Sequence, residues 1–271
     1  MSLNLIDTHC HVHEIEASLT GVHDKWFSDG AERSAETVLG AARQAGVERM
    51  IVIGTTLADS ELAVHFAQEH EGVWASIGIH PHEAKDYRSS DQKARFAALA
   101  TEPKVVAVGE CGLDYFYNLS PHDAQAELLR FQIELALKHD LPLSFHVRDA
   151  FDDFWPIFDS YVGVRGVLHS FTDTLANMEQ GVKRELYVGI NGIATFAKSE
   201  AKHVIYRTIP QQLLLLETDA PFLTPAPFRG KVCEPKHVAN VAEFLAHLRG
   251  EPLAELAAAT TTNAEALFKL I

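Results

Sequence analysis

The chain has 271 residues, 47% of them hydrophobic, and a formal net charge of −14. This length is enough for one large core or two modest ones, and the acidic balance excludes a general basic surface for nucleic acid, although bound metal ions and a few Arg or Lys can still create one local positive region. No apolar run reaches the ~18 residues of a membrane helix, no secretion signal is present and only three cysteines occur, so we expect a cytoplasmic protein without disulfides or membrane contact.

Short β-rich apolar runs alternate along the chain with amphipathic helical stretches. The predicted strands are residues 3–6, 49–54, 73–79, 105–109, 142–145, 166–168, 186–190 and 213–216. The predicted helices are residues 34–45, 59–70, 91–100, 123–139, 151–161, 175–184, 198–206, 237–248, 253–258 and 262–270. Thr262 or Asn263 is the expected N-cap of the last helix. Residues 13–33 are polar and irregular, and we expect them to form a long loop.

Eight strands, each followed by a helix, indicate a parallel sheet. Eight such units in 271 residues predict the α/β class, as a closed (β/α)8 TIM barrel in a single domain, residues 1–271. The alternative is an open doubly wound sheet, which normally carries a Gly-rich phosphate turn after its first strand, and no such turn is present here. In a barrel the C-terminal ends of all strands meet at one mouth, where the chemistry is sited.

The first strand ends in Asp7-Thr8-His9-Cys10-His11. Residues two apart on a strand point to the same face, so His9 and His11 lie side by side with Asp7 one step deeper. Two neutral imidazoles held close together are a good start on a metal site. Cys10 should point to the other face as a buried thiol.

Later strand ends add residues of the same kinds, namely His80, Glu110, His146, His169 and Asp219. Each of them alone has an ordinary interpretation, since a single His80 is more often a loop histidine. Together they are hard to explain by packing, because burying charged and imidazole groups without partners is unfavourable. One or two divalent metal ions would supply those partners.

The number of candidate ligands suggests two ions, because a single catalytic zinc takes about three protein ligands plus water. We expect His9, His11 and Asp219 around one ion and His146 and His169 around the other, with Glu110 bridging them. Ions in such sites activate a water as nucleophile, and Asp219 can accept its proton. The His-rich ligand set suits Zn, Mn, Fe or Ni better than Mg, so the metal stays open.

These motifs resemble those of the TatD family of metal-dependent hydrolases, a branch of the amidohydrolase superfamily. The matching stretches are Asp7-Thr8-His9-Cys10-His11, Gly78-Ile79-His80-Pro81, Gly109-Glu110-Cys111-Gly112-Leu113-Asp114-Tyr115, His146-Val147-Arg148, His169-Ser170-Phe171, Glu217-Thr218-Asp219-Ala220-Pro221 and Asn263. They follow the family's order over essentially the whole chain. The resemblance implies a two-metal phosphodiesterase, a magnesium- or manganese-dependent DNase with 3′-to-5′ exonuclease activity.

The resemblance also implies roles for individual residues. The metal-site residues become His9, His11, Glu110, His146, His169 and Asp219, with Asp219, Glu110 and His80 as the catalytic set. His80 would contact the substrate phosphate or the attacking water, and Arg148 is a further predicted substrate contact. Residues 229–235 resemble the family's loop after strand eight, where Arg229 is suited to clamp a phosphate. The alternative for Arg229 is a solvated loop arginine.

The leading hypothesis is a deoxyribonuclease that cleaves phosphodiester bonds in single-stranded DNA, with no membrane contact and no obligate protein partner. A second is a metal-dependent amide or ester hydrolase, such as an aminoacyl-tRNA deacylase, because the same metals and Asp219 serve either bond. A third, a metal-binding protein without catalysis, is disfavoured by Asp219 and an open site. Trp26, in the long loop, either stacks on a base or anchors the loop.

Overall fold

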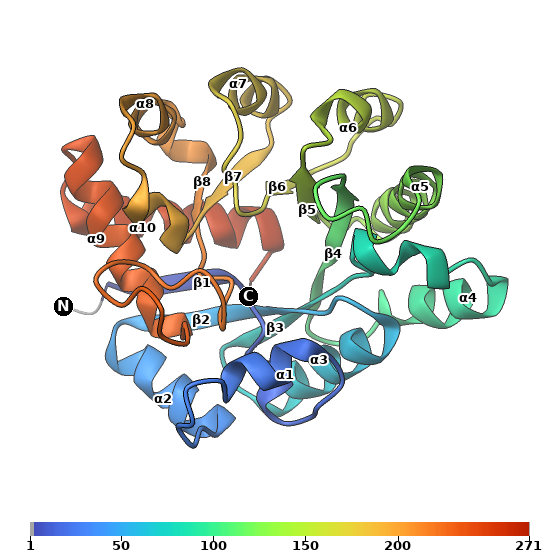
Figure 1. Cartoon of the computed structure of the whole chain (residues 1–271), viewed down its shortest axis with the longest axis horizontal. Coiled ribbons are helices and arrows are strands. Elements are labelled where there is room, and N and C mark those ends of the chain that lie inside the picture. Colours follow the sequence, from blue (N-terminus) through green and yellow to red (C-terminus); the bar gives the residue numbers. More distant parts are fainter. Residues whose placement is uncertain (1–2, 271) are drawn as a thin grey trace. The chain divides into compact units, whose positions relative to one another are not determined.

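The computed structural model describes residues 3–270 (Figure 1). Strands and helices alternate along these residues as the sequence predicts. The strands are β1 (Leu5–Cys10), β2 (Val47–Ile53), β3 (Val73–Ile77), β4 (Val105–Asp114), β5 (Leu143–Arg148), β6 (Gly166–Leu168), β7 (Tyr187–Ile190) and β8 (Leu214–Leu216). The α-helices are α1 (Gly21–Trp26), α2 (Ala35–Gln44), α3 (Leu57–Glu69), α4 (Ser90–Leu99), α5 (His122–Lys138), α6 (Phe151–Phe158), α7 (Leu175–Lys183), α8 (Glu200–Thr208), α9 (Val238–Arg249) and α10 (Leu253–Phe268).

Two predictions about local structure are wrong. Residues 13–33 are not only loop, since they contain α1 and most of a 3-10 helix, Val12–Ile15. The two predicted C-terminal helices form the single helix α10, because Ala259-Thr260-Thr261 between them contains no Gly or Pro to break the helix. Asn263 therefore lies inside a helix and is no N-cap. Its side-chain amide donates hydrogen bonds to the carbonyl oxygens of Gln211 at 2.7 Å and Leu214 at 2.9 Å.

The contacts divide the chain into two compact units. We call Ile53–His169 the continuous unit, and the described residues of Met1–Val52 and Ser170–Ile271 the discontinuous unit. The single-domain organisation expected from the sequence stays a prediction. No helix within residues 3–270 is both long and apolar enough to cross a bilayer.

In the discontinuous unit, parallel pairing joins β7 to β8 and β1 to β2. Cys10 pairs with Ala220, which brings the end of β1 beside the segment after β8. Two backbone hydrogen bonds fix this junction. The amide of His11 donates to Ala220 at 2.8 Å, and the amide of Asp219 donates to His9 at 2.8 Å. Residues 9, 11 and 219 are therefore held in one backbone frame.

In the continuous unit, parallel pairing runs β3–β4–β5–β6. Gly112 on β4 pairs with His146 on β5 and has φ +151°. A Cβ at Gly112 would lie 1.8 Å from the carbonyl oxygen of His146, so only glycine allows this approach. The close pairing carries β4 on to Asp114, five residues beyond the predicted end of the strand.

The strands read as continuous apolar runs because parallel strands are buried on both faces. All six residues of β1 are buried, polar ones included. In the continuous unit, Phe145 of β5 packs edge-on against Phe154 and Phe158 of α6, with ring centroids 5.1 and 5.9 Å apart. Cys10, Cys111 and Cys233 are buried free thiols, as expected for Cys10.

Candidate metal centre

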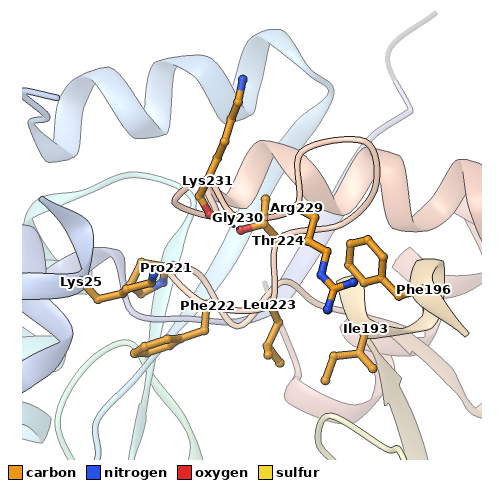
Figure 2. Close-up of a pocket in the computed structure, with 10 residues that line it drawn as sticks. All are labelled: Lys25, Ile193, Phe196, Pro221, Phe222, Leu223, Thr224, Arg229, Gly230 and Lys231. Atoms are coloured by element: carbon orange, nitrogen blue, oxygen red, sulfur yellow. Dashed lines mark hydrogen bonds between the residues drawn. The ribbon is translucent and has the colours of Figure 1, made fainter. Parts of the chain in front are cut away.

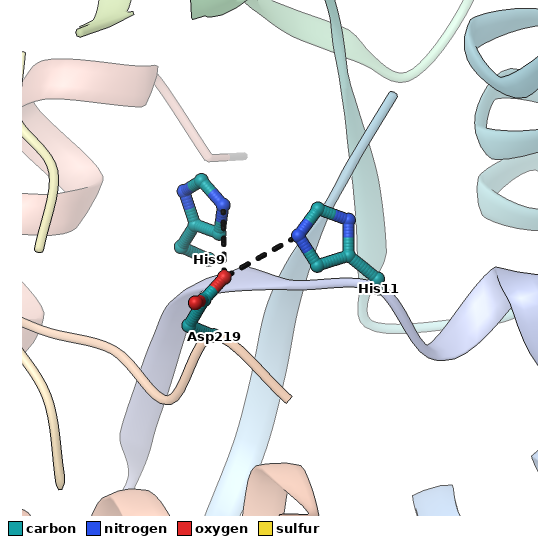
Figure 3. A group of neighbouring side chains, drawn as sticks. All are labelled: His9, His11 and Asp219. Carbon is teal, nitrogen blue, oxygen red and sulfur yellow. Dashed lines mark ion pairs between the residues drawn. The ribbon is translucent and has the colours of Figure 1, made fainter. Parts of the chain in front are cut away.

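His9, His11 and Asp219 form a first cluster, in the discontinuous unit (Figure 3). Asp219 Oδ1 lies 3.6 Å from His9 Nε2 and 3.4 Å from His11 Nε2. Both histidines are buried, and the Asp219 side chain is 16% exposed. One ligand atom from each residue lies within 4.8 Å of the other two. The three residues predicted to share an ion thus converge on one point.

Asp7 lies outside this cluster and joins β1 to the end of β8. Its carboxyl group accepts hydrogen bonds from the amides of His9 at 3.3 Å and Thr218 at 2.9 Å, and from the Thr218 hydroxyl at 2.6 Å. Complete burial raises the pKa of Asp7 to about 8 in spite of these hydrogen bonds. Asp7 therefore holds the segment that carries Asp219.

A second cluster, in the continuous unit, is centred on Glu110 Oε1. That oxygen lies 2.8 Å from His146 Nδ1, 3.5 Å from His80 Nε2 and 3.7 Å from His169 Nε2. Ligand atoms of His80, Glu110 and His146 all lie within 4.8 Å of one another. His80, which the sequence suggested as a substrate contact, is thus placed among the predicted ligands.

Two carboxylates set the charge of this cluster. Burial alone would lower the pKa of His146, but its hydrogen bonds with Asp114 and Glu110 outweigh burial and raise the pKa to about 9. Burial lowers the pKa of His80 to about 4, which leaves that imidazole neutral. The raised pKa therefore favours a positive charge on His146, between the two carboxylates. Imidazole nitrogens and carboxylate oxygens together are a fitting donor set for divalent transition metals, as they are in the first cluster.

Asp114 and His82 complete the second cluster, and the sequence reasoning gave neither a role. Asp114 Oδ2 lies 2.9 Å from His146 Nε2 and 3.1 Å from His82 Nε2. Burial alone would raise the pKa of Asp114, but hydrogen bonds with His146, His82 and the Tyr117 amide hold it well below its usual range. The alternation of side chains along a strand could have identified Asp114, because it lies four residues after Glu110 and therefore on the same face of β4.

Arg229 lies in the loop after β8, on the wall of a pocket of about 380 Å³. Figure 2 shows its guanidinium beside Phe196 and Ile193, and the guanidinium carbon lies 4.8 Å from the centroid of the Phe196 ring. Lys25 and Lys231 also line this pocket, so it combines apolar walls with three cationic side chains.

Trp26 anchors its segment, and the alternative that it stacks on a base is wrong. Its side chain is fully buried, and its indole N–H donates a 3.0 Å hydrogen bond to the carbonyl oxygen of His11. A buried indole offers no face to a ligand. Trp26 instead holds the backbone of one residue in the first cluster.

Residues 6–269 match the model of the TatD related DNase family. The chain belongs to this family. YabD of Bacillus subtilis, named an uncharacterized metal-dependent hydrolase, is 36% identical over 268 residues, which cover 98% of this chain and 99% of YabD. The 3′-5′ ssDNA/RNA exonuclease TatD of Citrobacter rodentium is 37% identical over 240 residues, covering 86% and 91% of the two chains.

Solved structures of TatD proteins share the fold. The crystal structure of YjjV, a TatD homologue from Escherichia coli, superposes with a TM-score of 0.87 at 30% identity and covers 100% of both chains. A TatD family hydrolase from Entamoeba histolytica superposes with a TM-score of 0.85 at 21% identity, which supports the fold alone. The predicted family, the (β/α)8 barrel and the assignment as a metal-dependent hydrolase are confirmed.

Proposed function

We propose that this chain is an exonuclease that removes nucleotides from the 3′ end of single-stranded DNA. The observation that carries the proposal is the pair of His–carboxylate clusters in a chain of the TatD related DNase family. Relatives from Citrobacter rodentium and Escherichia coli, 37% and 33% identical to this chain, are named 3′-5′ ssDNA/RNA exonucleases. The cytoplasm stays the predicted location.

We propose that two divalent ions take part. His9, His11 and Asp219 would hold one, and His146 and His169 the other, with Glu110 shared because the strand ends of a barrel meet at one mouth. Such ions, when bound, activate water and offset the charge on phosphate. The proportion of imidazole favours Mn or Zn over Mg as the tightly held metal.

Side chains of the protein would transfer the proton and bind the substrate phosphates. Asp219 accepts a proton from the attacking water, since its carboxylate is partly exposed while its histidine neighbours are buried. His80, neutral because burial lowers its pKa to about 4, offers a hydrogen bond to the substrate phosphate. Arg148 and Arg229 bind phosphates of the strand, and a guanidinium can do so through two parallel hydrogen bonds.

The test is Asp219→Asn, which keeps the size of the side chain but removes its basicity. We expect turnover of a 3′-labelled single strand with Mn²⁺ to fall by roughly 100- to 10,000-fold, with an unchanged circular dichroism spectrum. Asp123→Asn, at an exposed position of α5, is the matched control and should keep full activity. Near-wild-type nuclease activity in Asp219→Asn would contradict the assignment.

The same preparation decides between substrates. We expect release from single-stranded DNA, with 5′-labelled and 3′-labelled strands reporting the polarity and a matched RNA strand reporting the sugar preference. The alternative of amide or ester hydrolysis is not favoured, because the named relatives are exonucleases. Hydrolysis of aminoacyl esters without release from any phosphodiester would reverse that order.

A further inference from the structure

The loop after β4 carries a group of exposed apolar side chains. Phe116 is 55% exposed, Tyr117 53% and Leu119 53%, all within four residues of chain. A single exposed hydrophobic residue needs no explanation, but a group of them usually marks an interaction site. Two of these three side chains are aromatic and present flat faces.

Arg148, at the end of β5, completes the group. Its guanidinium carbon lies 3.9 Å from the centroid of the Phe116 ring and 4.9 Å from that of Tyr117. The two rings meet edge to face, with centroids 4.9 Å apart and planes at 88°. We call Phe116, Tyr117 and Arg148 the aromatic platform. It combines two exposed aromatic rings with a positive charge in a protein whose net charge is −14.

The aromatic platform is fixed to the second cluster. The amide of Tyr117 donates a 2.9 Å hydrogen bond to Asp114 Oδ1, while the other oxygen of that carboxylate lies 2.9 Å from His146 Nε2. The Tyr117 ring also lies edge-on to His82, with centroids 5.4 Å apart. One carboxylate thus connects the platform to a predicted metal ligand. The Tyr117 end of the platform therefore lies beside the second cluster.

We propose that the aromatic platform binds an unpaired base of the substrate strand, with Arg148 on the adjoining phosphate. Proteins that hold single strands without sequence preference combine aromatic faces for the bases with positive charge for the backbone. Bases within a duplex already stack on each other, so the platform selects single-stranded ends. This inference rests on the proposed nuclease function and names how that activity chooses its substrate.

The test measures binding, so that it does not depend on turnover. Mn²⁺-loaded protein is titrated into a fluorescent single strand protected from cleavage by phosphorothioate linkages, and into a strand of the same length and charge with abasic residues. We expect Phe116→Ala to raise the Kd for the normal strand roughly 5- to 150-fold, which corresponds to the 1–3 kcal/mol measured for loss of one base–aromatic stack. The Kd for the abasic strand should stay within about twofold, and Phe116→Trp should restore wild-type affinity.

Leu119→Ala is the matched control, because it removes an equally exposed apolar side chain from the same loop without removing a ring face. It should leave both affinities unchanged. Equal weakening by Leu119→Ala, equal weakening for the abasic strand, or no weakening by Phe116→Ala would each overturn the proposal. A change of oligomeric mass in Phe116→Ala would instead assign the patch to a protein partner. Failure of the proposed function would show separately, as no release from an unprotected strand.

Discussion

Replacing Trp26 tests whether this residue stabilises the fold or binds the substrate. The indole is fully buried and donates to the carbonyl oxygen of His11. Trp26→Ala removes about 150–250 Å² of buried aromatic surface, which at ~25 cal/mol per Å² corresponds to about 4–6 kcal/mol. Measured Trp-to-Ala losses in cores are about 3–5 kcal/mol. We therefore expect the free energy of unfolding to fall by about 4 kcal/mol.

Trp26→Phe keeps a ring but removes the N–H donor. The His11 carbonyl then keeps its 3.2 Å hydrogen bond from the Glu14 amide, so the lost indole hydrogen bond and the smaller buried ring together lower the free energy of unfolding by about 1–3 kcal/mol. Urea unfolding followed by circular dichroism measures both changes. The control is Trp74→Phe, whose half-buried ring lies 4.7 Å from the Lys104 ammonium and should lose about 1 kcal/mol or less.

The affinity of the same variants for single-stranded DNA tests whether Trp26 also contacts the substrate. If Trp26 only anchors its segment, the Trp26→Phe variant should bind the protected strand as tightly as the wild type although the variant is less stable. A loss of less than about 1 kcal/mol in Trp26→Ala, together with clearly weaker binding of the strand, would refute the anchoring role and restore base stacking.

Three further changes test other parts of the molecule. Burial lowers the pKa of His237 to about 4, so the folded state binds fewer protons than the unfolded state below pH ~6.5. The free energy of unfolding of the wild type, measured with urea, should therefore fall by up to about 3 kcal/mol between pH 6.5 and 4. His237→Gln should remove this fall. Thr218→Val removes a hydroxyl that donates to buried Asp7, and calorimetry should show a loss of about 2–3 kcal/mol. Mn²⁺ at 100 times its Kd should add about 2.7 kcal/mol in the same measurement, and less in His11→Ala.

Each of these has its own contrary outcome. Equal pH slopes in His237→Gln and the wild type would show that His237 titrates normally. His65→Gln, at an exposed position of α3, is the matched control and should keep the wild-type slope. A loss below about 0.5 kcal/mol in Thr218→Val would mean that the Asp7 hydrogen bond adds little. Equal stabilisation of wild type and His11→Ala by Mn²⁺ would place the ion elsewhere.

The strand-end residues were predictable because two simple rules locate them. Side chains alternate along a strand, and parallel strands bring their C-terminal ends to the same edge. His9, His11 and Asp219 therefore converge as expected, although more than 200 residues of sequence separate them. Helix α1 was missed because it is short and largely polar. Thr20 was the signal, since its side chain accepts from the Val22 amide as an N-cap.

The surroundings of the second cluster were less accessible to sequence reasoning. The role of Asp114 depends on β4 continuing past Gly109, which in turn depends on how closely Gly112 approaches His146. The exposure of Phe116 could not be read from the sequence either, because an aromatic residue after a strand is equally consistent with burial. Both features depend on tertiary contacts rather than on local pattern.

The discontinuous unit has a consequence for synthesis on the ribosome. His9 and His11 leave the ribosome before the other residues of the two clusters, and Asp219 follows 210 residues after His9. At ~5–20 residues per second the delay is roughly 10–40 s. The residues of the second cluster all lie within Ile53–His169, so they emerge together and earlier. A nascent chain stalled before residue 219 would therefore carry two exposed imidazoles at its first strand, open to any metal or chaperone nearby.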